Sequence, residues 1–321
     1  MKTFFPLVID STFLMEFDSC QMSGFRKYLQ HLSKSADEST DLVAGKAFAR
    51  GLEVARKAYY NEGADENEAV LLGSSALLEE YGDHIPFKMT KAPDRMVTAL
   101  ELYFIENPMC MDVAQPVKLA NGEYAIEYSF AHELPFEHPD LPGQPLLITG
   151  RADMLVEYAG KLLVFDDKTT GAAFSKSWAQ QWNTRGQFTT YNWGLRKDGI
   201  KTKGAYIRGI YLGKTQIKFL DHVSSRGQWQ VDIWEEQMLA KVGQILAKYK
   251  EYKESGEHPA KFFFGAWNES CFKYFRPCAF QDLCRSEKAE MFLEGEYDQR
   301  IWLPHEQRRA ELNEFLEELG G

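Results

Sequence analysis

The sequence lacks any apolar run of about eighteen residues or more, the length that a membrane-spanning helix needs. It also lacks a secretory signal, an internal repeat and any low-complexity tract. Lysine and arginine number 37 against 47 aspartates and glutamates, and the net charge of −10 argues against broad electrostatic adhesion to nucleic acid. These absences argue against a membrane protein and predict a soluble protein of the cytoplasm.

Cysteine is scarce, and its count is odd. The five cysteines are Cys20, Cys110, Cys271, Cys278 and Cys284. An odd number without a secretory signal indicates reduced thiols rather than disulfides. Three of the five crowd into residues 271–284 and one lies near the other end of the chain. Four thiolates are what a 4Fe-4S cluster or a structural zinc ion requires, while a buried free cysteine needs no metal and is the simplest interpretation of Cys110.

Hydrophobic residues make up 44% of the 321-residue chain, enough to bury a sizeable core in one large domain or two joined ones. Apolar periodicity predicts helices over residues 11–34, 41–60, 66–82, 91–105 and 233–252. Alternation predicts strands over 113–119, 123–130, 205–211 and 215–220, with a hairpin turn at Asn121-Gly122. This order predicts an α/β fold.

Two carboxylates end neighbouring apolar runs. Asp153 follows Leu146-Leu147-Ile148 in Gly150-Arg151-Ala152-Asp153, and Asp166 ends Leu162-Leu163-Val164-Phe165. The turn chemistry of residues 158–161 predicts a β-hairpin between them. Carboxylate oxygens from paired strands suit one Mg²⁺ or Mn²⁺ ion. Lys168 lies two residues beyond Asp166, so strand geometry sends both side chains to the same face.

A helical Gln/Tyr pair, Gln187 and Tyr191, follows this hairpin in Gln187-Phe188-Thr189-Thr190-Tyr191. The pair alone is common by chance, and a lone Asp-x-Lys is usually a solvated turn. The information comes from the order and spacing of hairpin carboxylates, a lysine and then the pair. Together these parts indicate a metal-dependent nuclease.

On these residues the chain resembles the PD-(D/E)XK nucleases, and within them the RecB-like branch that includes AddB-type subunits and CRISPR-associated iron-sulfur exonucleases. The resemblance covers most of residues 11–285. It implies a restriction-endonuclease-type mixed central sheet flanked by helices. It also implies metal binding by Asp153 and Asp166 and an activating role for Lys168. The carbonyl of Asp167 is a further candidate ligand. Gln187 and Tyr191 would assist substrate binding or organise the site.

The sequence departs from the branch on its earlier helix, where the branch often has a metal-binding histidine. Ala49 stands at that position in Gly45-Lys46-Ala47-Phe48-Ala49-Arg50-Gly51-Leu52-Glu53. Glu53 lies one helical turn further on the same face and is the candidate replacement ligand. Glu127, on a predicted strand, is a weaker candidate.

The resemblance also implies that Cys20, Cys271, Cys278 and Cys284 hold a 4Fe-4S cluster, which would join the helical N-terminal region to the C-terminal segment. Cys278 and Cys284 have the spacing of the relatives, whereas the gap between Cys271 and Cys278 is longer than theirs. The expected organisation is a helical region over 1–110, a nuclease core over 111–255, a cysteine loop over 256–286 and an acidic segment over 287–321.

Basic and aromatic residues suggest a path for DNA. The candidate groove cations are Arg26, Lys27, Lys46, Arg50, Arg56, Lys57, Arg151, Lys168, Lys176 and Arg185. Trp178, Trp182, Phe188, Tyr191 and Trp193 lie among them, and their spacing fits either base stacking in a single-strand channel or a helix core.

The resulting hypothesis is a Mg²⁺- or Mn²⁺-dependent deoxyribonuclease, an exonuclease or end-processing enzyme of recombination, repair or phage replication. A second hypothesis is an iron-sulfur- or zinc-stapled DNA-binding or assembly protein whose nuclease site has degenerated. The missing histidine favours the second hypothesis, and the retained Asp153, Asp166 and Lys168 oppose it.

Overall fold

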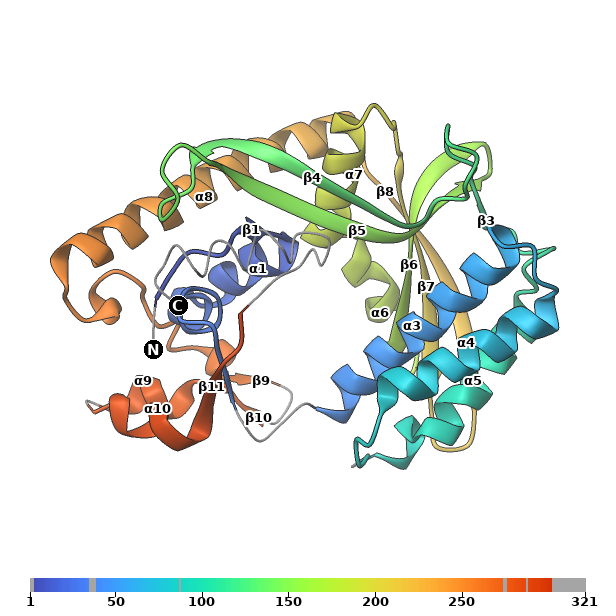
Figure 1. Ribbon diagram of the computed structural model, residues 1–321, viewed down its shortest axis with the longest axis horizontal. Coiled ribbons are helices and arrows are strands. Elements are labelled where there is room, and N and C mark those ends of the chain that lie inside the picture. Colours follow the sequence, from blue (N-terminus) through green and yellow to red (C-terminus); the bar gives the residue numbers. More distant parts are fainter. Residues whose placement is uncertain (1–2, 35–38, 87, 274–275, 287, 302–321) are drawn as a thin grey trace. The chain divides into compact units, whose positions relative to one another are not determined.

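The computed structural model describes residues 3–34, 39–86, 88–273, 276–286 and 288–301. The chain divides into two compact units, each made of separated stretches of sequence. The first unit comprises residues 1–37, 130–150 and 232–321, and the second comprises residues 38–129 and 151–231. Figure 1 shows the elements of both units in the colours of the sequence. None of the described helices combines the length and the apolar character that crossing a membrane would need.

The first unit begins with a short strand and a broken helical segment. Strand β1 (Val8–Ile9) pairs in parallel with Leu147 and Ile148 of β5 (Pro145–Tyr158). The predicted continuous helix over 11–34 is wrong. The structure has α1 (Ser11–Ser19), α2 (Gln21–Gly24), a π-helical turn (Phe25–Leu29) and β2 (Leu32–Lys34). Cys20 adopts an extended conformation, with φ −163° and ψ 117°, and separates the first two helices.

The rest of the first unit comes mainly from the C-terminal part of the chain. Most of α8 (Gln228–Ser255) belongs to it, and so do the 3₁₀ turns Pro259–Lys261 and Glu269–Cys271. They are followed by β9 (Phe272–Lys273), β10 (Arg276–Pro277), α9 (Gln281–Arg285), α10 (Glu290–Glu296) and β11 (Tyr297–Gln299). Strand β11 pairs antiparallel with β2, so residues about 265 positions apart lie side by side.

The helices of residues 38–129 in the second unit agree closely with the predicted ones. They are α3 (Thr40–Tyr60), α4 (Glu66–Tyr81), a 3₁₀ turn (Met89–Lys91) and α5 (Pro93–Glu106). The side chain of Ser39 caps α3 and that of Asp65 caps α4, each accepting a hydrogen bond from a backbone N–H of the first turn. A Cβ on Gly73 would lie 2.5 Å from the carbonyl oxygen of Gly51, so glycine permits the close approach of α3 and α4.

A mixed sheet forms the centre of the second unit. Besides β1, its strands are β3 (Gln115–Pro116), β4 (Ile126–Glu137), β5, β6 (Lys161–Thr170), β7 (Gly204–Leu212) and β8 (Ile217–Ser225). Strands β4 and β5 extend into the first unit. Strands β5 and β6 pair antiparallel, β6 and β7 in parallel, and β7 and β8 antiparallel. At the predicted Asn121-Gly122 turn, Lys118 and Tyr124 form an isolated antiparallel bridge.

Helices cover both faces of this sheet. Ile210 and Leu212 of β7 belong to one buried cluster with apolar residues of α3, α4 and α5. A Cβ on Gly209 would face the other side of the sheet, where it would meet Trp178 of α6 (Lys176–Gln180). Helix α7 (Gly186–Lys197) follows α6 in the chain. Figure 1 shows α3–α5 on one side of β6 and β7 and α6 and α7 on the other. The predicted α/β fold, a mixed central sheet flanked by helices, is confirmed.

Candidate active site

The β5–β6 hairpin brings the two predicted carboxylates to neighbouring positions. Met154 pairs with Phe165, and Asp153 and Asp166 are the next residues on the two strands. The backbone N–H of Asp167 donates to Oδ2 of Asp153 at 2.8 Å. The connection is the two-residue turn Ala159-Gly160, with φ values of 49° and 70°, as the right-handed twist of a hairpin favours. Local turn chemistry therefore sets the register that juxtaposes the carboxylates.

Buried Asp166 forms an ion pair with the partly exposed Lys168. The Lys168 Nζ lies 2.5 Å from Oδ1 of Asp166, whose side chain is 2% exposed. Burial raises the pKa of Asp166, the Lys168 ammonium opposes that rise, and the Asp153 carboxylate adds to it. Burial lowers the pKa of Lys168, but Asp166 and Asp153 outweigh that effect and raise it. The lysine is thus a cation held against the carboxylate, as their shared strand face predicts.

The helical pair is directed at the same carboxylate. The side chain of Gln187, at the start of α7, donates to Oδ2 of Asp166 at 3.3 Å and to the Tyr191 hydroxyl at 2.8 Å. One helical turn separates Gln187 from Tyr191, so the tyrosine fixes the amide that contacts Asp166. The structure therefore brings together Asp153, Asp166, Lys168, Gln187 and Tyr191 in the second unit.

Two glutamates are the candidates for a third metal ligand, and of these Glu127 interacts electrostatically with Asp153. Glu53 of α3 forms ion pairs with Arg50 at 2.9 Å and with Lys57 at 2.7 Å. Glu127 of β4 pairs with Arg151 at 2.8 Å and has a φ of 56°, a left-handed conformation that is unusual for a residue other than glycine. Burial raises the pKa of Glu127 most, and the Asp153 carboxylate raises it further.

Asp167 turns its side chain to the opposite face of β6 from Asp166. Its carboxylate lies 2.7 Å from Nη2 of Arg56 and accepts a hydrogen bond from the Tyr103 hydroxyl at 3.0 Å. The main-chain carbonyl of Asp167, and not its carboxylate, is therefore the candidate metal ligand. Arg56 is buried and is not an exposed groove cation. The sequence signal for this burial is the position of Arg56 one turn from Leu52, on the apolar face of α3.

The four predicted cluster cysteines line one cavity in the first unit. This cavity has a volume of about 260 Å³, and its lining includes Cys20, Cys271, Cys278 and Cys284. The backbone N–H of Ala266 donates to Sγ of Cys20 at 3.3 Å. Burial raises the pKa of Cys284 to about 11; Arg26 lowers it, and the other three thiols add to the rise. Cys110 is exposed and belongs to the second unit, so the predicted buried position for Cys110 is wrong.

Within the described residues, no group of three or more His, Cys, Asp or Glu side chains is arranged to hold a metal ion. At the carboxylates, lysines and arginines pair with the oxygens of Asp166, Glu53 and Glu127. The donor set nevertheless fits the implied groups, with carboxylates for Mg²⁺ or Mn²⁺ and free thiols around one cavity for iron or zinc.

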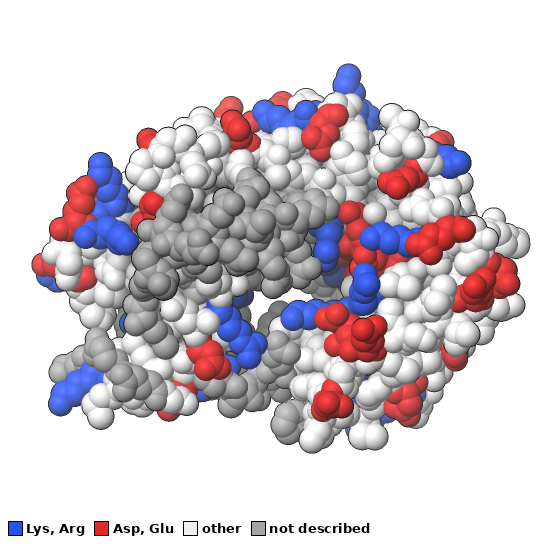
Figure 2. Space-filling model, viewed as in Figure 1, with Lys and Arg blue, Asp and Glu red and all other residues white. Residues whose placement is uncertain are grey.

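Charged residues of both signs mix on the face of the described residues that Figure 2 draws. Figure 2 shows Lys and Arg side chains interspersed with Asp and Glu over α3 and α4. The aromatic residues considered for base stacking are all buried: Trp178, Trp182, Phe188, Tyr191 and Trp193. They belong to the core, and the stacking alternative is wrong for them.

Comparison with known proteins gives one family and distant solved structures, among them the two that follow. The family model described as the PD-(D/E)XK nuclease superfamily matches residues 12–285, a range that includes every predicted site residue. No curated protein sequence matches. The protein SSO0001 is similar at 15% identity over 61% of this chain and 73% of its own, with a TM-score of 0.26. A Eubacterium rectale protein, provisionally named an exonuclease, has 12% identity over 74% of this chain and 80% of its own, with a TM-score of 0.42.

Proposed function

We propose that this chain, which belongs to the PD-(D/E)XK nuclease superfamily, hydrolyses phosphodiester bonds in DNA with Mg²⁺ or Mn²⁺, as an exonuclease or end-processing enzyme. The observation that carries the proposal is the Asp166–Lys168 ion pair beside Asp153. It joins metal-binding carboxylates to a cation within reach of one phosphate, which is what in-line attack at phosphorus requires.

Each residue has a role in this proposal. Asp153 and Asp166 would hold one or two metal ions, together with the carbonyl of Asp167. A bound Mg²⁺ or Mn²⁺ would supply Lewis acidity and lower the pKa of a coordinated water. Lys168 would then stabilise charge on the phosphoryl oxygens or orient the water. Gln187 would hold the Asp166 carboxylate, and Tyr191 would hold Gln187.

We further propose that the cysteines place the chain in the RecB-like, iron-sulfur branch, next to the AddB-type and CRISPR-associated exonucleases, with a role in recombination, repair or phage replication. The support is the cavity that Cys20 shares with Cys271, Cys278 and Cys284, although 251 residues separate the first two. Four free thiols around one cavity suit a 4Fe-4S cluster, and a structural zinc ion is the alternative.

A second candidate is a DNA-binding or assembly protein whose nuclease site has degenerated. Ala49 favours it, because this exposed residue of α3 stands where the branch often has a metal-binding histidine. Digestion of end-labelled DNA in the presence of Mn²⁺ separates the two candidates.

Purified protein should digest end-labelled DNA in the presence of Mn²⁺, and EDTA should stop the reaction because the carboxylates need a divalent cation. Single-stranded and double-stranded substrates are compared on denaturing gels. A ladder of labelled products that shorten by single nucleotides would indicate attack from an end. Absence of cleavage on both substrates at saturating Mn²⁺ would favour the degenerate-site candidate.

A charge-removing substitution tests the third ligand. If Glu53 replaces the missing histidine, Glu53→Gln should weaken Mn²⁺ affinity and cleavage together, because an amide keeps the shape but loses the charge that hard cations prefer. Mn²⁺ binding is measured by calorimetry, with Glu101→Gln as the exposed helical control. An unchanged titration in Glu53→Gln, with a weakened one in Glu127→Gln, would assign the role to Glu127.

A further inference from the structure

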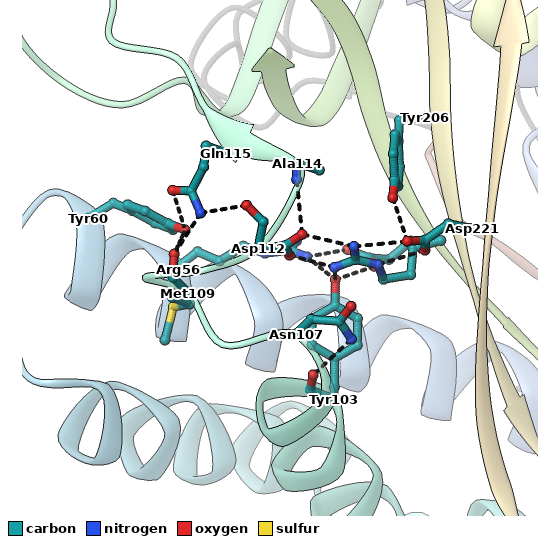
Figure 3. A network of polar contacts seen from close by, with 12 residues as sticks. Arg56, Tyr60, Tyr103, Asn107, Met109, Asp112, Ala114, Gln115, Tyr206 and Asp221 are labelled. Atoms are coloured by element: carbon teal, nitrogen blue, oxygen red, sulfur yellow. Dashed lines mark hydrogen bonds and ion pairs between the residues drawn. The ribbon is translucent and has the colours of Figure 1, made fainter. Parts of the chain in front are cut away.

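A network of two buried arginines lies behind strand β6. Arg56 of α3 donates from Nη2 to the Tyr103 hydroxyl at 2.6 Å and pairs with Asp167 at 2.7 Å. Arg208 of β7, with no exposed surface, donates from Nη1 to the same hydroxyl at 3.2 Å. Tyr103 therefore connects both guanidinium groups to the carboxylate of Asp167. Figure 3 shows Tyr103 directed from its helix toward this network.

Two further carboxylates neutralise Arg208. Its Nη1 and Nη2 donate to Asp112 at 2.6 and 3.0 Å, and its Nε and Nη2 donate to Asp221 at 2.8 and 3.2 Å. Figure 3 shows Tyr206 pointing at Asp221, to which its hydroxyl donates. Buried charges that are paired in this way fix geometry more than they add stability, since apolar residues of similar volume often stabilise an interior as well.

The network contacts β6 at the two residues that flank Asp166. Strand geometry sends Phe165 and Asp167 to the same face. The Arg56 guanidinium lies 5.1 Å from the ring centroid of Phe165 and that of Arg208 lies 5.4 Å from it. Asp166 is thereby held facing Gln187, on the opposite face. The Asp167 backbone, fixed through its side chain, also donates the hydrogen bond that orients Asp153.

We propose that Arg56 and Tyr103 are positioning residues for the metal-binding carboxylates Asp153 and Asp166, which they orient through Asp167 and Phe165. This inference rests on the proposed metal-dependent nuclease function. It predicts that loss of the network displaces the carboxylates without removing any group that contacts DNA. Displacements of about 1 Å can lower a rate by about 10²-fold.

Three variants test the proposal: Tyr103→Phe, Arg56→Met and Arg56→Lys. Mn²⁺ affinity is measured by calorimetry without DNA, and kcat and KM are measured on an end-labelled oligonucleotide. Arg56→Met should lower kcat about 10²-fold and weaken Mn²⁺ binding, with KM nearly unchanged. Tyr103→Phe should lower kcat about 10-fold because only one hydroxyl is lost. Arg56→Lys should restore part of the loss through its charge but not its planar contacts.

Matched controls come from another buried tyrosine and cation of the second unit, on α4 and in the 3₁₀ turn Met89–Lys91. Tyr81, whose hydroxyl donates to the Lys91 carbonyl at 2.7 Å, controls for Tyr103, and Lys91, paired with Asp41 at 2.9 Å, controls for Arg56. Tyr81→Phe and Lys91→Met should destabilise the fold but leave kcat and Mn²⁺ affinity unchanged in folded protein. Equal losses in the control and test variants would overturn the positioning role.

The remaining outcomes separate this inference from the function on which it rests. If Arg56→Met does not fold, Tyr103→Phe, which removes a single oxygen atom, decides the question. If the wild-type protein binds Mn²⁺ but cleaves no DNA, the nuclease proposal fails and the Mn²⁺ titrations still decide the positioning role. A wild-type protein that binds no Mn²⁺ would overturn both.

Discussion

Replacing Asp166 by asparagine, or Asp153 or Lys168 by alanine, should abolish DNA cleavage while the protein stays folded. Asparagine keeps the shape of the Asp166 side chain and an oxygen for Gln187, but it removes the charge that binds a divalent cation. Loss of one electrostatic element of a catalytic site typically lowers the rate by about 10²-fold or more. Initial rates on end-labelled DNA at saturating Mn²⁺ measure the effect, and circular dichroism monitors folding.

The three substitutions should differ in metal binding, and this difference distinguishes the metal ligands from the catalytic lysine. Asp166→Asn and Asp153→Ala should weaken Mn²⁺ affinity. Lys168→Ala should abolish cleavage without weakening Mn²⁺ affinity, because the lysine competes with the metal for the Asp166 carboxylate. Lys201→Ala, which removes an exposed lysine, is the control. A rate in Lys168→Ala like that of the wild type would remove Lys168 from the site.

The second large effect is expected at the cysteine cavity. Protein purified without oxygen should be brown and carry about four iron atoms per chain. Cys20→Ala should lose the iron and unfold at a lower temperature. A cluster that joins Cys20 to Cys271 closes a loop of 251 residues, which in the chain-entropy model restricts the unfolded state by about 5.5 kcal/mol.

Cys110→Ala, which removes an exposed thiol of the other unit, should change neither the iron content nor the unfolding temperature. Colourless protein with stoichiometric zinc would replace the iron assignment and keep the cross-link between distant segments. Iron retained in Cys20→Ala would contradict the cross-link itself. Iron and zinc are quantified by elemental analysis on the same samples that are used for thermal unfolding.

The hairpin that carries the carboxylates could be predicted because each of its parts has a local signal. Ala159-Gly160 permits a tight turn, apolar runs flank it, and period-2 geometry places Asp166 and Lys168 on one face. The helix over 41–60 could likewise be predicted from the sequence, since a polar cap precedes a regular apolar stripe. In each case the residues that determine the element are close in sequence.

Features that depend on distant residues could not be predicted. The break at Cys20 leaves no periodic signal, because buried apolar residues such as Phe17 and Met22 continue on both sides of it. The place of Arg56 on the apolar face of α3 indicates burial, but its partner Asp167 lies 111 positions later and no local pattern connects the two. The strained backbone of Glu127 is a property of the folded strand and has no counterpart in the sequence.

The interleaving of the two units has a consequence for synthesis on the ribosome. Residues 38–231 contain the whole of the second unit, so all its segments emerge before the last segment of the first unit, which starts at residue 232. At about 5–20 residues per second, roughly 10–40 s pass between synthesis of the N-terminal segment of the first unit and the start of its last segment. During this interval Cys20 lacks the three cysteines with which it shares the cavity. Premature oxidation of a nascent thiol would therefore threaten the first unit more than the carboxylate hairpin.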